Sequence, residues 1–191
     1  ETLARNNHRT LPQNSFFQSV TTRTAGFNTA DLDKMTDSGK MGMVLLMVIG
    51  GSPGSTAGGM KTTTAAVLFA MAISVFRKNE QAHLYNRRIA EETQRNAATI
   101  FVLYMMLFTG SAMVISYVEK VPLVTAFFET GSAIGTVGLS LGLTPTLGLA
   151  SRLVLICLMF FGRVGGLTLI FATVSGKRTE YKYPQEKITV G

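Results

Sequence analysis

The fold is decided by the stretch Gly131-Ser132-Ala133-Ile134-Gly135-Thr136-Val137-Gly138-Leu139-Ser140-Leu141-Gly142-Leu143-Thr144. It lies between apolar runs that are long enough to span a membrane, but its four glycines predict a loop. Backbone N–H and C=O groups at membrane depth need partners, so an irregular segment is tolerated there only inside protein or beside a wet cavity. The stretch is therefore expected to be a loop held within a bilayer.

A second copy of this pattern lies near the start of the chain. Phe16-Phe17-Gln18 precedes Thr24-Ala25-Gly26-Phe27-Asn28, as Phe127-Phe128-Glu129 precedes Thr136-Val137-Gly138-Leu139-Ser140. Thr-Val-Gly is the core with which potassium channels present rings of carbonyl oxygens to a dehydrated cation. The repetition predicts two pore units in tandem, with backbone oxygens of eight filter residues as K⁺ ligands: Thr24, Ala25, Gly26, Phe27, Thr136, Val137, Gly138 and Leu139.

Composition predicts a membrane protein. Charged residues make up 15% of the 191 residues and the mean hydropathy is +0.28, whereas soluble domains contain about 25% charged residues. The net charge of +7 comes from basic residues beside the apolar runs, which is the usual orientation signal and argues against a nucleic-acid partner. Because the chain begins with Glu1 rather than Met, it is expected to be part of a longer protein.

The first predicted unit has no opening span. Asn14 is expected to cap a short helix over Ser15–Thr22. About 20 residues are needed to cross a bilayer, so this helix must turn back at its filter. Asp31–Lys40 is expected to be a charged surface segment.

A glycine-rich loop interrupts the next apolar run. Met41–Ile49 and Thr62–Phe76 are apolar, and Gly50–Gly59 between them contains five glycines and a proline. Such a segment cannot continue a helix, so one crossing is predicted to consist of two half-helices joined by an intramembrane loop. This loop is expected to bulge into the cavity under the filter and obstruct it.

The second predicted unit follows a basic segment that is expected to face the cytoplasm. Ala97–Val118 has no charge and is the clearest transmembrane helix. Val121–Ala133 is a short helix with Pro122 in its first turn, and Leu147–Val174 is the last span. The predicted divisions are residues 1–76 (first unit), 77–95 (cytoplasmic linker), 96–176 (second unit) and 177–191 (cytoplasmic tail).

Four segments together resemble one family: Ser15–Thr29, Gly50–Thr62, Phe127–Gly142 and Phe161–Gly166. The chain is similar to the C-terminal half of the Trk/Ktr/HKT superfamily of potassium transporters, most closely its KtrB-type membrane subunits. That family places four repeats around one pore. The resemblance implies an all-α membrane protein built of span, re-entrant pore helix, filter and span, in which this chain supplies the third and fourth repeats of a four-fold pseudo-symmetric cation channel.

The resemblance also implies roles and partners. It implies filter glycines at Gly26 and Gly138, and a pore-facing Arg163 beneath the filter. It implies potassium as the transported ion, no organic cofactor, no enzymatic activity, and a multi-pass position among the lipids of the cell membrane. The partners implied are the first two repeats, a second copy in a homodimer and a cytosolic nucleotide-binding regulatory ring. The implied gate consists of Gly50, Gly51, Ser52, Pro53, Gly54, Ser55, Thr56, Ala57, Gly58 and Gly59, with Lys61 and Arg163.

Two other functions compete with the channel. Gly54–Thr62 nearly matches the phosphate-binding motif G-x-x-x-x-G-K-[ST], but Met60 interrupts it, which leaves a P-loop nucleotide hydrolase as a remote alternative. A sodium- or proton-coupled secondary transporter is the closer alternative, since it also uses glycine-broken spans. The repeated Thr-x-Gly after a short helix favours the channel.

The two cations of the predicted gate also have structural alternatives. A central charge costs about 2.5 to 3.5 kcal/mol on the insertion scale, which favours a pore-facing Arg163. Helix carbonyls or Glu129 could instead satisfy it. Lys61 could simply reach water by snorkelling.

Overall fold

The computed structural model describes residues 11–28, 31–78, 82–84 and 87–165. The fold is chiefly helical, as predicted, with one short antiparallel strand pair. Its elements are α2 (Leu11–Thr21), η1 (Leu32–Lys34), α3 (Asp37–Ile49), α4 (Thr62–Phe76), β1 (His83–Leu84), β2 (Arg87–Arg88), α5 (Glu91–Glu119), α6 (Leu123–Ile134), η2 (Thr144–Thr146) and α7 (Leu149–Val164).

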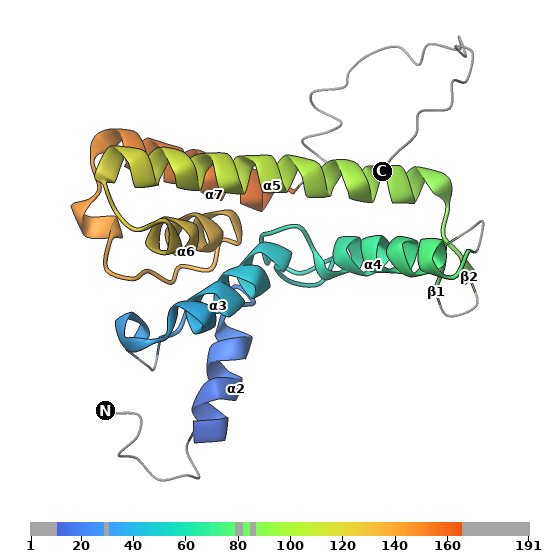
Figure 1. The fold of residues 1–191 in the computed structure, drawn as a ribbon, viewed down its shortest axis with the longest axis horizontal. Helices are drawn as coiled ribbons and strands as arrows, with labels where there is room; N and C mark the ends of the chain where they lie inside the picture. The colour runs from blue at the N-terminus through green and yellow to red at the C-terminus, as the bar shows by residue number, and fades with distance from the viewer. Residues whose placement is uncertain (1–10, 29–30, 79–81, 85–86, 166–191) are drawn as a thin grey trace.

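The long helix α5 runs the length of the fold (Figure 1). Its 29 residues make it about 43 Å long at 1.5 Å per residue. It contains the predicted transmembrane helix Ala97–Val118 and, among the described residues, is the one helix long and apolar enough to cross a membrane. Helices α6 and α7 pack along one half of α5, and α4 packs along the other half.

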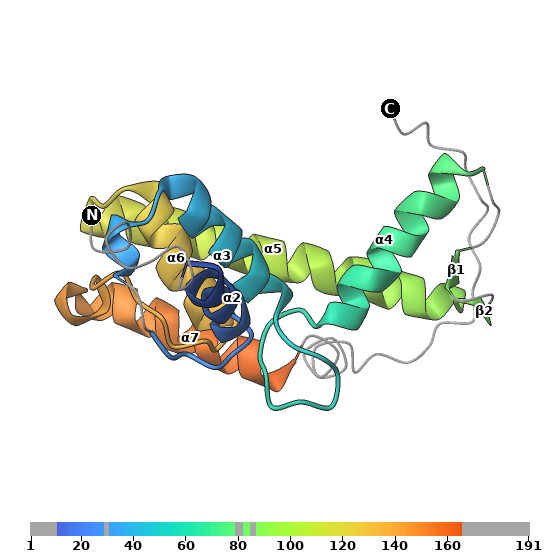
Figure 2. The same cartoon turned by 90° about the horizontal axis from the view of Figure 1, so that it is seen from below.

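The short helix α6 is at the centre of the packing. Helices α3, α5 and α7 all contact it (Figures 1 and 2), and every residue from Phe128 to Ile134 is buried. Its Gly131, Ser132 and Ala133 are small, which lets neighbouring helices approach closely, as in other membrane helix bundles. The structure thus holds a 12-residue helix, too short to span a bilayer, inside protein.

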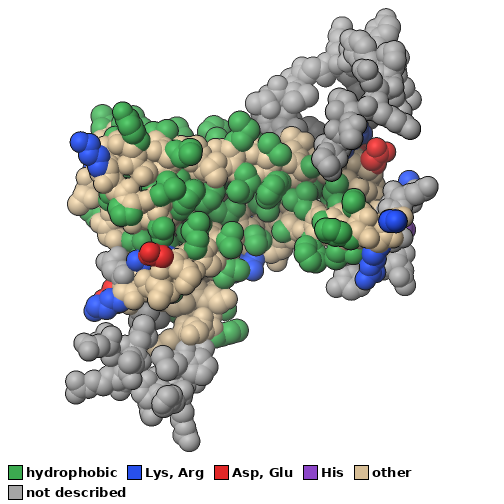
Figure 3. Space-filling model, in the orientation of Figure 1, with side chains coloured by type: hydrophobic (Ala, Val, Ile, Leu, Met, Phe, Trp, Pro, Cys, Tyr) green, Lys and Arg blue, Asp and Glu red, His purple; other side chains and the backbone are tan. Residues whose placement is uncertain are grey.

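The outer face is apolar in its middle and charged at its ends (Figure 3). Side chains of α5 and α7 that point away from the core are large and hydrophobic, including Met106, Met113, Leu153 and Phe160. Exposed apolar surface of this extent is rare on soluble monomers and suits contact with lipid. This surface agrees with the membrane protein predicted from composition.

The first helix starts earlier than predicted. Helix α2 begins at Leu11, so Asn14 lies within it and is not its N-cap. Pro12 is the second residue of the helix, where a missing N–H costs no hydrogen bond because the first amides have no intrahelical partner. The proline therefore fits the helix start, and the prediction that the helix begins after Asn14 was wrong.

The segment predicted as charged surface is partly structured. Leu32 in η1 is buried. Helix α3 already begins at Asp37, where the Thr36 Oγ1 accepts a hydrogen bond from the Gly39 amide at 3.3 Å. This N-cap offsets the poor helix propensity of the glycines that follow.

The boundaries after this point are largely as predicted. Helix α3 ends at Ile49, and α4 covers Thr62–Phe76, so the predicted helices on either side of the glycine-rich loop are confirmed. That they form one membrane crossing stays a prediction. Pro122 is the N-cap of α6 rather than a residue of its first turn.

The basic segment after α4 was predicted as a linker, but it contains β1 and β2. Helix α5 then begins at Glu91, earlier than predicted. Two acidic residues in its first turn favour that start. Residues 166–174 of the predicted last span and the predicted tail 177–191 lie outside the described residues.

The close approach of α7 to α6 predicts a sharp difference between two glycines. A Cβ at Gly162 would lie 2.0 Å from the Ile134 carbonyl oxygen, whereas a Cβ at Gly110 on α5 would meet nothing within 4 Å. Gly162→Ala should lower the free energy of unfolding by about 1–3 kcal/mol through overpacking. Gly110→Ala should be neutral or stabilising, since alanine favours helix by ~0.5–1 kcal/mol.

The measurement is the thermal unfolding midpoint of the purified full-length protein in detergent. Equal midpoints for the two variants would contradict this packing of α7 on α6.

Candidate functional site

Two loops with the same backbone pattern follow α2 and α6. Thr24 and Gly26 have φ of 70° and 73°, and Thr136 and Gly138 have φ of 50° and 88°. The residue between each pair has negative φ. Left-handed threonine is unusual because its branched Cβ crowds the backbone, and such strain costs about 1–3 kcal/mol per residue. The two loops therefore share a conformation that neither would adopt for its own stability.

The two loops touch each other. A Cβ at Gly26 would lie 2.3 Å from the Val137 carbonyl oxygen, so only glycine fits there. The Thr24 hydroxyl donates to the Gly135 carbonyl at 3.3 Å. Segments separated by 111 residues in sequence thus form one structural unit.

Most carbonyl groups of the two loops have no protein partner. Among the described residues, no donor bonds the carbonyls of residues 24–26 or 136–139. The Phe27 carbonyl differs, because it accepts a hydrogen bond from the Thr21 hydroxyl at 2.6 Å. Each loop also lies at the C-terminal end of a helix, where the macrodipole is negative. Both features favour a cation.

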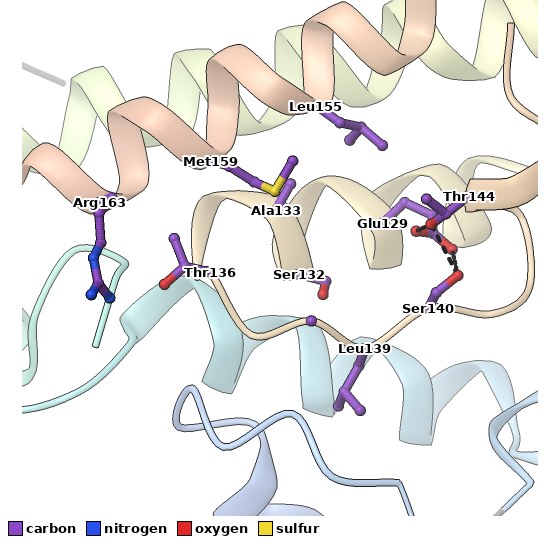
Figure 4. A pocket seen from close by; sticks show the side chains of 11 residues that line it. Glu129, Ser132, Ala133, Thr136, Leu139, Ser140, Thr144, Leu155, Met159 and Arg163 are labelled. Atoms are coloured by element: carbon purple, nitrogen blue, oxygen red, sulfur yellow. Dashed lines mark hydrogen bonds between the residues drawn. The ribbon is translucent and has the colours of Figure 1, made fainter. Parts of the chain in front are cut away.

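Side chains of the two preceding helices hold the far ends of the loops. The Gln18 Nε2 donates to Asn28 Oδ1 at 3.4 Å. At the matching place in the second unit, Glu129 accepts hydrogen bonds from the Ser140 hydroxyl at 2.6 Å, the Leu141 amide at 3.0 Å and the Thr144 hydroxyl at 2.7 Å. Figure 4 shows the two hydroxyl contacts of Glu129.

The two ends of the glycine-rich loop between α3 and α4 lie against each other and form a closed neck at Gly50, Gly58 and Gly59. A Cβ at Gly50 would lie 2.2 Å from the Gly58 carbonyl oxygen, and one at Gly59 would lie 2.9 Å from Gly50 Cα. The Met60 amide donates to the Val48 carbonyl at 3.1 Å and closes the neck. Residues 52–56 are exposed beyond it. The loop therefore leaves the end of α3 and returns to the same place before α4 begins.

Three contacts join this loop to the two units. The Gly58 amide donates to the Thr136 hydroxyl at 3.2 Å. Arg163, exposed at the end of α7, donates to the Thr56 carbonyl, and its side chain points toward the loop in Figure 4. Arg23 donates to the Gly50 carbonyl at 2.8 Å. The loop is therefore held by Arg23, Arg163 and Thr136.

Two cavities lie beside these loops. One, of about 470 Å³, is lined by Glu129, Thr136, Gly138 and Arg163 among others. Figure 4 shows Glu129 and Arg163 at opposite ends of this cavity. The other, of about 450 Å³, is lined by Arg23, Thr24 and the glycine-rich loop.

Comparison with known proteins identifies the family. The sequence profile of TrkH, described as cation transport protein, matches residues 8–181.

The chain belongs to the TrkH family of cation transport proteins.

Relatives in this family are uptake proteins. The chain is 42% identical over 185 residues to the potassium/sodium uptake protein NtpJ of Enterococcus hirae, covering 93% of this chain and 41% of that protein. It is 35% identical over 177 residues to the Ktr system potassium uptake protein B of Bacillus subtilis, with 93% and 40% covered. The corresponding protein of Vibrio alginolyticus is 34% identical over 177 residues, with 93% and 39% covered. The chain spans about two fifths of the length of these curated relatives.

Membership of the TrkH family confirms the resemblance found in the sequence and sets aside the nucleotide-hydrolase alternative. The motif-like glycines join two helices, whereas a phosphate loop follows a strand. The family is described as cation transport protein, which agrees with the apolar outer face of the helices.

The structure brings most of the predicted site residues together. The two filter loops, the glycine-rich loop and Arg163 are linked by the contacts described above. Lys61 folds back onto the Ala57 carbonyl of its own loop. Glu129 bonds hydroxyl groups and an amide, so it is not the partner of Arg163.

Two residues that hold loops in the structure were not predicted to do so. Arg23 had no predicted role, and Glu129 was considered only as a partner of Arg163. A signal for Arg23 existed, because it directly precedes the first filter threonine within an apolar protein. Glu129 carried a similar signal as an acidic residue inside an apolar helix.

The contact between Gly58 and Thr136 predicts how the glycine-rich loop is docked. A Cβ at Gly58 would lie 2.5 Å from the Thr136 Oγ1, so Gly58→Ala should push the loop off the filter. Amide hydrogen exchange of residues 52–60 should then rise about tenfold, the effect of losing roughly 1.4 kcal/mol of local stability.

Gly42→Ala on α3 is the matched control, since its Cβ would meet nothing within 4 Å. Unchanged exchange in Gly58→Ala would show that this contact does not dock the loop.

Proposed function

We propose that this chain supplies two of four pore-lining repeats in a potassium uptake protein of the cell membrane. The supporting observation is a pair of adjoining loops, each with left-handed Thr and Gly on either side of one other residue. Among the described residues, all of their carbonyls except that of Phe27 accept no hydrogen bond. Carbonyls at membrane depth require a partner, and a dehydrated K⁺ requires carbonyls. The residues that act as ligands in this proposal are 24–27 and 136–139.

The short helices add electrostatic support to this proposal. Helices α2 and α6 end at Thr21 and Ile134, directly before the two loops. Their C-terminal partial negative charges of about half an elementary charge each would lower the energy of a cation between the loops. Passage needs no covalent chemistry, so the proposed protein is a transport protein without enzymatic activity.

The choice of ion rests on the relatives. One is named for potassium and sodium uptake and two for potassium uptake. We assign potassium as the ion that passes and place the first two repeats in sequence outside this chain. The word "system" in two of those names supports partner subunits, which we propose to be a second copy of the membrane subunit and a cytosolic nucleotide-binding ring.

A cation-coupled secondary transporter is the second candidate. It is favoured by one observation, the glycine-rich loop that separates the apolar helices α3 and α4, as loops separate the broken helices of transporters. The two functions differ in a measurable way, because a coupled transporter requires a sodium or proton gradient. A channel requires only the gradient of potassium and the membrane potential.

The filter proposal predicts a loss of ion preference at Gly138. Its φ of 88° is costly for any residue with a Cβ, so Gly138→Ser should tilt the carbonyls of its loop. About 1–2 kcal/mol of such strain corresponds to roughly a tenfold lower preference for potassium over sodium. Uptake of both ions by potassium-transport-deficient cells expressing the full-length protein measures the change.

Gly110→Ser is the control for this experiment. Gly110 lies on α5, where a Cβ would meet nothing within 4 Å, away from both proposed filter loops. If Gly138→Ser keeps the wild-type preference, the filter assignment is wrong. If the wild-type protein takes up no potassium, the proposed function is wrong.

We further propose that residues 50–59 are the gate, with Lys61 and Arg163. The loop reaches the second filter at Thr136 and is tied by Arg23 and Arg163. Its exposed tip has little apolar surface to hold it in one place. Alternative positions would then differ by a few kcal/mol, within the range that a regulatory subunit can bias through α3 and α4.

Shortening the loop tests this gate. Deletion within Ser52–Ala57 should raise ion flux roughly tenfold, as removal of about 1.4 kcal/mol of barrier would. It should weaken dependence on the regulatory subunit and leave the potassium-to-sodium preference unchanged. A length-preserving change of the same six positions to Gly and Ser should retain the obstruction. A shortened protein that reaches the membrane with equal or lower flux would refute the gate.

A further inference from the structure

Glu129 is a buried carboxyl group with an unusual set of partners. Its exposed fraction is 3%. Its Oε1 accepts hydrogen bonds from the Ser140 hydroxyl and the Leu141 amide, and its Oε2 accepts one from the Thr144 hydroxyl. Burying a carboxyl group is costly unless hydrogen bonds replace water, and these three contacts do so. In the part of the chain that the structure describes, none of its partners is a cation.

The partners of Glu129 all belong to the segment that leaves the second filter loop. Ser140 directly follows Leu139, whose carbonyl is the last of the four proposed ligands in that loop. Thr144 lies in η2, the turn that leads to α7. One side chain on α6 therefore fixes the chain just after the filter at three points within five residues.

The first unit has a weaker version of this arrangement. Gln18 reaches Asn28 at 3.4 Å through its amide, and Asn28 corresponds to Ser140 when the two filters are aligned. The Gln18 Oε1 is buried and has no partner among the described residues. Gln18 and Glu129 thus each hold the segment that follows a loop, but they differ in charge and in the number of hydrogen bonds they make there.

We infer that Glu129 is a positioning residue that fixes the second filter loop and thereby sets its preference among monovalent cations. This inference rests on the proposed function of the loop as a filter. Selection between K⁺ and Na⁺ by carbonyl rings depends on how far the oxygens can move toward the smaller ion. Three hydrogen bonds to a carboxylate restrict that movement at the end of the loop, and the Gln18 contact restricts it less in the first unit.

Glu129→Gln is the direct test, because it keeps the shape of the side chain. A glutamine has no charge, and its NH₂ can only donate, so it cannot accept all three hydrogen bonds as the carboxylate does. In the full-length protein, amide exchange of residues 139–144 should become about tenfold faster, the effect of losing one hydrogen bond to a charged group. The potassium-to-sodium preference in uptake should fall by about the same factor.

Glu119→Gln is the matched control. Glu119 is also an acceptor for an amide and a hydroxyl, those of Gly148 and Ser151 at 2.9 and 2.6 Å, but it joins α5 to α7 away from the filter. It should lower stability without changing exchange in residues 139–144 or the ion preference. An equal fall in preference in Glu119→Gln would show a general structural effect and overturn the inference.

Thr144→Val provides a second variant if Glu129→Gln does not fold. It removes the Oε2 contact and keeps the carboxyl group, so a smaller change, roughly threefold, is expected in both measurements. Unchanged exchange and preference in the folded variants would overturn the inference. If wild-type protein takes up no potassium, the proposed function fails, and the exchange measurement still decides whether Glu129 positions the loop.

Discussion

A backbone carbonyl that accepts no hydrogen bond needs another partner wherever water is excluded. In the described part of the chain, most carbonyls of the two loops after α2 and α6 accept none, and the packing of the helices holds these loops against each other. Helices α3, α5 and α7 enclose α6, so that a helix too short to cross a bilayer is stable inside protein. The loops carry strained threonines, which are kept in place by contacts that the surrounding helices impose.

Close backbone approach is the second constraint. Gly26 lies against the Val137 carbonyl, the neck of the glycine-rich loop closes at Gly50 and Gly59, and Gly162 lies against α6. At each of these places a Cβ would overlap another backbone atom. The glycines therefore bring segments that are distant in sequence within reach of one another. Side chains such as Glu129 and Arg163 then fix the loops that glycine leaves without side-chain contacts.

Much of this arrangement followed from the sequence, for physical reasons that differ between segments. The two similar loops could be predicted because glycine recurs at the same spacing in both, and the break between α3 and α4 because Gly and Pro end helices. Helix starts were predicted less well. Pro12 precedes the predicted first helix and Asp37 lies in the predicted surface segment, yet proline is compatible with a first turn and Asp37 follows the Thr36 cap. The contacts of Glu129 and Arg23 join residues brought together only by folding, so no local pattern could reveal them.

Both loops contribute carbonyl oxygens to one cation pathway in the function proposed above. A structure of the full-length protein with Rb⁺ or Tl⁺ in place of K⁺ tests this, because the heavy ion is located by its scattering. We expect ion density between residues 24–27 and 136–139, at carbonyl contact distance from both loops. Ion density confined to another part of the protein, with both loops free of it, would contradict the claim.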